Sequence, residues 1–119
     1  MTVFVDNMKV RAYHGVFQQE RVVGADFLVS LRADCDATPA AVDSDRLEGT
    51  ISYADLVDIV KQEMAVASNL LEHVAARIAR RVLAHSELVQ RVWVRVTKCN
   101  PPIGCQTDGC GVEYTLEKH

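Results

Sequence analysis

A lysine occupies a position near the end of an alternating apolar pattern where a hydrophobic residue is expected. In "RVWVRVTKCNPPIG" the residues Val92, Val94 and Val96 face one side of a predicted strand, and the two-residue period places Lys98 on that side. Such a lysine can extend its stem along the apolar surface and keep its ammonium in water. Alternatively, an apolar wall favours the neutral amine, which is a candidate general base.

An acid lies in the first turn of a predicted helix, in "SNLLEHVAARI". The positive end of the helix dipole favours the ionised form of Glu72, and a carboxylate can accept two hydrogen bonds from an amidine-like edge. Small residues follow one turn later on the same side, which suggests room for a flat ligand: Ala75, Ala76 and Ala79. Simple compensation of the helix dipole is the competing interpretation of Glu72.

Three further side chains have chemistry to offer but are weak signals in isolation. Tyr53 follows the predicted helix cap Ser52, where positive potential eases the loss of a phenolic proton, although tyrosines at such positions commonly only pack. Glu20 lies in a polar loop and, taken alone, is a solvated charge. His14 lies at a predicted strand end, and we favour a structural histidine over a catalytic one there.

Length and composition favour one domain spanning residues 1–119, since a chain with 49% hydrophobic residues can bury one core. The net charge is −3 with acids and bases interleaved, so we expect no nucleic acid partner. The start "MTVFVDNMKV" reads as a strand without a signal-like leader, and no membrane-spanning run follows, which predicts a cytoplasmic protein and no membrane partner. The four cysteines form no CxxC pair, so we expect reduced thiols and no metal: Cys35, Cys99, Cys105 and Cys110.

The hydrophobic periodicity predicts an α+β fold in the order ββααββ, a four-stranded antiparallel sheet with both helices on one face. A bulge is expected at Asn7 and Met8, and the open face should carry Arg32, Trp93 and Arg95. Residues 13–27 are predicted as a loop and 36–50 as a connection. We expect strands at 3–13, 27–34, 88–97 and 111–117, a helix capped by Ser52 and Asp55, and a second helix from Ser68 or Asn69. Two unpaired sheet edges in so small a domain favour assembly with further copies.

Taken together, these segments resemble the dihydroneopterin aldolase family of folate biosynthesis. The matching stretches are "YHGVFQQE", "TISYADL", "SNLLEHVAARIA", "VRVTKCNPPIG" and "GCGVEYTLE", in family order over essentially the whole chain. The resemblance implies the tunnelling fold (T-fold), whose units join into a ring. It further implies a homo-octamer of two stacked tetrameric rings with active sites between subunits.

The resemblance also implies roles for the residues singled out above. Lys98 matches the catalytic lysine, and Glu20 matches the loop glutamate that contacts the lysine and the substrate. Glu72, beside the Leu71 backbone, matches the acid that anchors the amino-pyrimidine edge of the pterin, and Tyr53 matches the tyrosine supplied by the adjoining subunit. The implied reaction splits 7,8-dihydroneopterin into 6-hydroxymethyl-7,8-dihydropterin and glycolaldehyde with no cofactor, because the substrate ring itself stores the released electron pair.

Alternative functions stay open at this point. The related dihydroneopterin triphosphate epimerase handles the same ring, but the sequence offers no cationic cluster for a triphosphate. A lysine Schiff-base aldolase of another type would form a borohydride-trappable adduct. A non-catalytic, ring-forming pterin-binding module is a further alternative. It would give no catalytic role to the four matched residues, which are Lys98, Glu20, Glu72 and Tyr53. Epimerisation at C2′ is compatible with the aldolase as a side activity.

Overall fold

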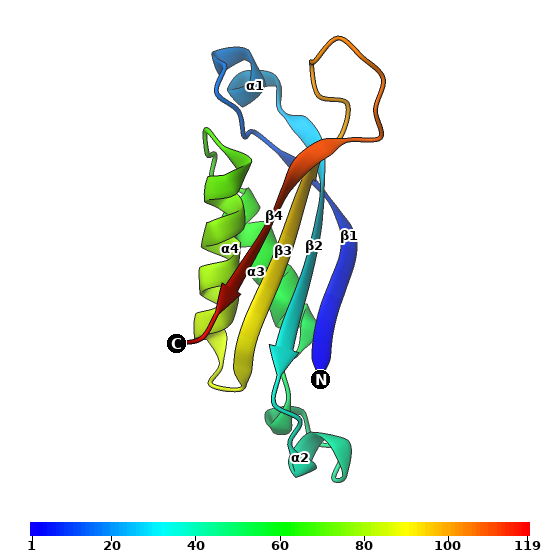
Figure 1. The fold of residues 1–119 in the computed structure, drawn as a ribbon, viewed down its shortest axis with the longest axis vertical. Helices are drawn as coiled ribbons and strands as arrows, with labels where there is room; N and C mark the ends of the chain where they lie inside the picture. The colour runs from blue at the N-terminus through cyan, green and yellow to red at the C-terminus, as the bar shows by residue number, and fades with distance from the viewer.

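The computed structural model describes residues 1–119. Its four strands form one antiparallel sheet in the order β1-β2-β3-β4 (Figure 1). The strands are β1 (Thr2–Ala12), β2 (Ala25–Cys35), β3 (Val89–Lys98) and β4 (Cys110–Glu117). All four predicted strands are therefore present, with ends that differ by one or two residues. β1 and β4 form the two edges of the sheet.

Two long helices, α3 (Tyr53–Met64) and α4 (Leu71–His85), cover one face of the sheet. Their apolar stripes meet the inward residues of the strands in one core, because inward side chains alternate along each strand. The predicted ββααββ arrangement is thus confirmed. The inner stripe contains Leu56, Ile59, Val60, Met64, Val74, Ala75, Ile78 and Val82, while Leu71 is only partly buried.

The starts of both helices differ from the prediction in detail. The Ser52 side chain accepts a hydrogen bond from the backbone N–H of Ala54 (3.3 Å), one residue before the Asp55 amide that a capping box would use. The second helix begins at Leu71 and not at Ser68 or Asn69. The reason is that Ser68 is buried and fixed in the turn between the helices, where its backbone bonds to residues outside the helix.

Short helical segments replace two stretches predicted as irregular. α1 (Gln18–Val23) lies within the predicted loop and ends at Gly24, whose φ of 77° suits glycine. α2 (Pro39–Val42) and the 3₁₀ turn η1 (Leu47–Gly49) lie within the predicted connection. α2 starts at Pro39 after Thr38, whose side chain accepts from an amide in the first turn, as expected for a capped helix start.

The predicted bulge in β1 is confirmed. The register with β2 shifts between Val5 and Met8, and Asn7 adopts a positive φ of 49°. The freed backbone N–H of Asn7 donates to the Ser30 hydroxyl at 2.8 Å. This bond gives the Asn7 amide a partner within the bulge.

The face of the sheet away from the helices carries a stacked aromatic and cationic group. The guanidinium of Arg32 lies 5.2 Å from the ring centroid of Phe4 and 5.6 Å from that of Trp93. The Trp93 indole N–H donates to the Glu113 carboxylate at 2.8 Å. Arg95 is exposed on the same face, so the predicted composition of this open face is confirmed.

No helix has the length and apolar character needed to cross a membrane.

Candidate active site

Lys98 is the last residue of β3, and its side chain continues the inward row that the valines of that strand begin. Val92, Val94 and Val96 are completely buried, whereas the Lys98 side chain retains 12% of its exposure. Its Nζ lies 5.9 Å from the ring centroid of Phe27, the residue opposite it on β2. The amine is therefore held against an aromatic surface at the rim of the core.

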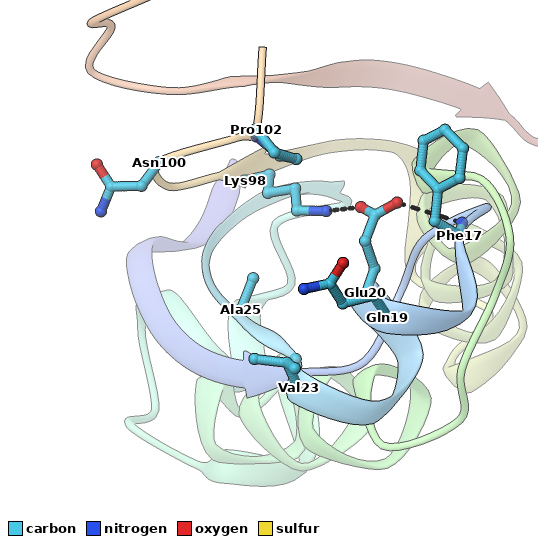
Figure 2. A pocket seen from close by; sticks show the side chains of 9 residues that line it. Phe17, Gln19, Glu20, Val23, Ala25, Lys98, Asn100 and Pro102 are labelled. Carbon is cyan, nitrogen blue, oxygen red and sulfur yellow. Dashed lines mark hydrogen bonds and ion pairs between the residues drawn. The ribbon is translucent and has the colours of Figure 1, made fainter. Parts of the chain in front are cut away.

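Glu20 lies opposite this amine on α1, and its carboxylate has two protein partners (Figure 2). Oε2 accepts a hydrogen bond from Lys98 Nζ, and Oε1 accepts from the backbone N–H of Phe17 at 3.3 Å. The bond to Lys98 is the main reason that the pKa of Glu20 is lowered; burial opposes the shift and the Phe17 amide adds to it. Glu20 is thus an ionised carboxylate that fixes the lysine in place.

Gly15 gives the Glu20 side chain the space it occupies. A Cβ at residue 15 would lie 2.6 Å from the Cβ and from the carboxyl carbon of Glu20. Contacts this short require one of the two groups to move. The absence of a side chain at Gly15 therefore allows the Glu20 carboxylate to occupy its observed position.

Lys98 and Glu20 line a cavity of about 420 Å³, within the size range of small-molecule sites. Figure 2 shows the two side chains meeting between the α1 segment and the residues that follow β3. The wall is mixed, with polar and apolar side chains, as suits a polar heterocycle. The lining residues are Phe17, Gln19, Glu20, Val23, Gly24, Ala25, Lys98, Asn100 and Pro102.

Leu71 and Glu72 begin α4 at the same end of the molecule as α1 (Figure 1). Glu72 is exposed in the first helical turn, as predicted, but it is not among the residues that line the cavity. Ala75 and Ala79 are buried in the hydrophobic core, and Ala76 is 9% exposed. Room for a flat ligand beside Glu72 stays a prediction.

Tyr53 lies apart from the other predicted site residues. It is the first residue of α3, and that helix of 12 residues is about 18 Å long. The far end of α3 leads to Ser68, which bonds to His14 and Gly15 just before α1, so Tyr53 is at the opposite end of α3 from α1. The ring is 70% exposed. One chain therefore brings Lys98 and Glu20 together and leaves Tyr53 free to contact another molecule.

His14 and Ser68 are two buried polar residues that join the segment before α1 to the turn between α3 and α4. His14 is 1% exposed, its ring meets Phe27 edge to face at 5.4 Å, and Nδ1 accepts from the Ser68 backbone N–H at 3.0 Å. Burial, followed by the charges of Arg77, Arg21 and Lys98, lowers the pKa of His14 to about 4, with a backbone contact to Met64 partly opposing the shift. His14 is therefore neutral, with its proton on Nε2.

Sequence reasoning considered Ser68 only as a helix start and did not consider Arg77. Ser68 is 3% exposed, and its hydroxyl contacts His73 Nδ1 at 2.8 Å and accepts from Arg77 at 2.9 Å. Arg77 also donates to the backbone carbonyls of Glu63 and Val66, at the end of α3. The only signal in the sequence was the short polar turn between two apolar helical stripes.

All four cysteines are free thiols.

Comparison with known proteins gives a consistent match over the full chain. The family model described as dihydroneopterin aldolase matches residues 3–115. The dihydroneopterin aldolase of Bacillus subtilis (strain 168) is 39% identical, covering 98% of this chain and 97% of its own. That of Staphylococcus epidermidis is 35% identical, covering 97% and 95%.

The fold matches solved structures equally well. The structure of E. coli dihydroneopterin aldolase in complex with neopterin superimposes with a TM-score of 0.86 and covers 98% of both chains. The sequence identity with that protein is 24%, so the comparison concerns the fold. The α+β arrangement with a four-stranded antiparallel sheet is that of the T-fold.

Proposed function

The chain belongs to the dihydroneopterin aldolase family, and we infer that it catalyses the carbon–carbon lyase reaction of that family in tetrahydrofolate biosynthesis. The reaction splits 7,8-dihydroneopterin into 6-hydroxymethyl-7,8-dihydropterin and glycolaldehyde. The observation that carries this function in the chain itself is the Lys98–Glu20 pair. The two side chains come from positions 78 residues apart and meet at the wall of a cavity large enough for a pterin.

The chemistry requires one proton acceptor, one electron sink and one proton donor. Loss of the proton from the 2′-hydroxyl lets its oxygen form the aldehyde as the C1′–C2′ bond breaks. The released pair moves into the C6=N5 imine of the ring, giving an enamine between C1′ and C6. Protonation of C1′ then restores the imine and leaves the hydroxymethyl product, so no external sink or cofactor is needed.

We assign the proton acceptor to Lys98, acting directly or through a water molecule. Its amine donates to the Glu20 carboxylate and lies 5.9 Å from the centroid of the Phe27 ring, so the acceptor is held in one position at the cavity wall. A pterin in the cavity would exclude water and so favour the neutral amine, which is the form that can take the hydroxyl proton.

We assign pterin binding to Glu72, Leu71, Glu20 and Tyr53. Glu72 is exposed and ionisable at a helix start, so it can accept two hydrogen bonds from the amino-pyrimidine edge, and the Leu71 backbone lies beside it. Tyr53, with an ordered water, would protonate the enamine carbon. Since Tyr53 lies at the opposite end of α3 from Glu20, the complete site requires this ring to come from an adjoining subunit.

We further propose that the protein forms rings through its two free sheet edges, with two tetrameric rings stacked as an octamer, and that it acts in the cytoplasm. The unpaired edges of β1 and β4 support ring formation, since such edges pair readily with further strands. The exposed Tyr53 supports sites shared between subunits. Four free thiols are compatible with a reducing compartment.

The decisive experiment is incubation of the purified protein with 7,8-dihydroneopterin and identification of the products by chromatography. We expect 6-hydroxymethyl-7,8-dihydropterin and glycolaldehyde in equal amounts, with 7,8-dihydromonapterin as a minor product if C2′ is also epimerised. A parallel incubation with dihydroneopterin triphosphate tests the epimerase alternative. Preferential epimerisation of the triphosphate, or no release of glycolaldehyde, would overturn the proposed function.

A further inference from the structure

The segment that carries Glu20 and the turn that precedes Glu72 are tied together by a small set of buried hydrogen bonds. Ser68 is the centre of this set. Its N–H donates to His14 Nδ1, its carbonyl accepts from the Gly15 N–H, and both bonds are 3.0 Å long. Both bonds join Ser68 to consecutive residues of the other segment, His14 and Gly15.

Arg21 provides a second connection between the segment that carries Glu20 and the turn that precedes Glu72. Arg21 donates from Nε to the Gly15 carbonyl at 3.1 Å and from its other end to the Asn69 side chain. Arg21 is adjacent to Glu20 on α1, so the same short helix provides the carboxylate and this clamp. Residues 14–21 and 68–69 thus behave as one unit.

The start of α4 depends on this unit. The hydroxyl of Ser68 contacts His73 Nδ1 at 2.8 Å, and His73 is the immediate neighbour of Glu72. The His73 backbone N–H in turn bonds to the Leu70 carbonyl at 3.2 Å. A shift of Ser68 therefore moves the first turn of α4 and the carboxylate that it carries.

We propose that His14 is a positioning residue for pterin binding: through Ser68 it holds the first turn of α4, with Leu71 and Glu72, in a fixed position relative to Glu20 and Lys98. This inference rests on the proposed function only in that it takes Glu72 as the pterin anchor. His14 itself does not need to touch the substrate. Its contribution is an acceptor atom for the Ser68 amide inside a site from which water is excluded.

The buried position explains why a histidine is suited to this task. An amide with no partner in the core is costly, so the Ser68 N–H requires an acceptor at this point. The imidazole provides one at Nδ1, and the rest of the ring packs against Phe27. Burial, and after it the charges of Arg77, Arg21 and Lys98, lower the pKa of His14, so the ring is neutral and able to accept.

The test uses two variants of nearly the same size and branching. His14→Asn keeps an acceptor oxygen two bonds from Cβ, where Nδ1 lies, whereas His14→Leu has no acceptor. We expect His14→Leu to raise KM for 7,8-dihydroneopterin and Kd for neopterin about tenfold, with kcat changed less than about threefold. His14→Asn should restore both constants to within about threefold of the unchanged protein. Val89→Ala, a buried truncation at the opposite end of β3, controls for general destabilisation and should leave KM unchanged.

Hydrogen exchange of the peptide covering residues 66–72 provides a readout that does not depend on pterins. Exchange at Ser68 should be faster in His14→Leu and close to normal in His14→Asn. Equal effects of Asn and Leu on KM and on exchange, or a fall in kcat with KM unchanged, would overturn the role of His14. If the unchanged protein neither binds neopterin nor releases glycolaldehyde, the proposed function fails, and the exchange comparison still decides whether His14 holds the turn.

Discussion

At the scale of single residues, the central feature is an amine held at the rim of the core by a carboxylate from another part of the chain. Lys98 is 12% exposed and Glu20 is 19% exposed, so this pair is shielded far more than an ordinary surface ion pair. Removing one partner leaves the other without its main hydrogen bond. Substitutions at either position therefore affect both charge and geometry.

Lys98→Ala should lower kcat on 7,8-dihydroneopterin by about 10²- to 10⁴-fold, because the proton acceptor is lost while most of the cavity remains. Neopterin affinity, measured by fluorescence titration, should fall much less. Lys118→Ala is a suitable control, since Lys118 is an exposed lysine that bonds to Glu87 at the other end of the sheet. Turnover close to normal in Lys98→Ala would refute the catalytic assignment.

Gly15→Ala should reduce kcat/KM about tenfold or more by displacing the Glu20 carboxylate, since the new methyl group would lie 2.6 Å from it. The effect acts through Glu20 if it largely disappears in a Glu20→Ala background, which a double-mutant cycle measures. Full additivity of the two substitutions would show that Gly15 serves a different purpose.

At the scale of elements, the strands and long helices follow from periodicity, whereas the short helix that carries Glu20 does not. The alternation of Val92, Val94 and Val96 is a strong local signal that locates β3 and places Lys98. α1 has only six residues, none of them buried, so there was no apolar stripe to detect. It is held by tertiary contacts of Glu20 and Arg21, which no local pattern reports.

The bond between His14 and the turn that joins α3 to α4 leads to a prediction about stability in acid. His14 has a pKa of about 4 in the folded protein and an ordinary value of 6.5, so its stabilising contribution is complete above pH 6.5 and is lost as the pH falls towards 4. From pH 7 to pH 5 the free energy of unfolding should fall by about 2 kcal/mol on account of His14 alone. Urea titrations at fixed protein concentration would measure this loss.

His14→Asn is the reference for that measurement, because asparagine does not titrate in this range. The variant should lack the extra loss between pH 7 and pH 5. Glu20 does not interfere, since its pKa is lowered from an ordinary value of 4.5 and its own contribution is lost only below that pH. Parallel curves for the two proteins would show that His14 is not the titrating group.

At the scale of the whole molecule, the separation of Tyr53 from Lys98 predicts complementation between subunits. Oligomers of Lys98→Ala alone and of Tyr53→Ala alone should both be inactive. Mixed oligomers, formed by unfolding and refolding the two together, should regain up to about a quarter of the normal activity, because some sites receive both intact residues by random association. Absence of recovery, with mixed assembly verified by mass spectrometry, would place Tyr53 outside the shared site.

Sequence reasoning reached the order of the elements along the chain, the helical layer and the open face, because each depends on a period that the chain displays directly. The assignment of Lys98, Glu20, Leu71, Glu72 and Tyr53 to one site came from resemblance to a family and not from periodicity. The structure of one chain brings together Lys98 and Glu20 and places Leu71 and Glu72 at the same end. The buried bonds of Ser68 were beyond prediction, since they join residues more than fifty positions apart.

The stacked group on the open face also has a spectroscopic consequence. Trp93 is the only tryptophan in the chain, and its indole lies against the Arg32 guanidinium and bonds to Glu113 on the face of the sheet away from the helices. Its ultraviolet emission therefore reports on that surface alone. If the proposed assembly covers this face, dilution should change the emission wavelength without loss of circular dichroism, because the protomers separate while each stays folded.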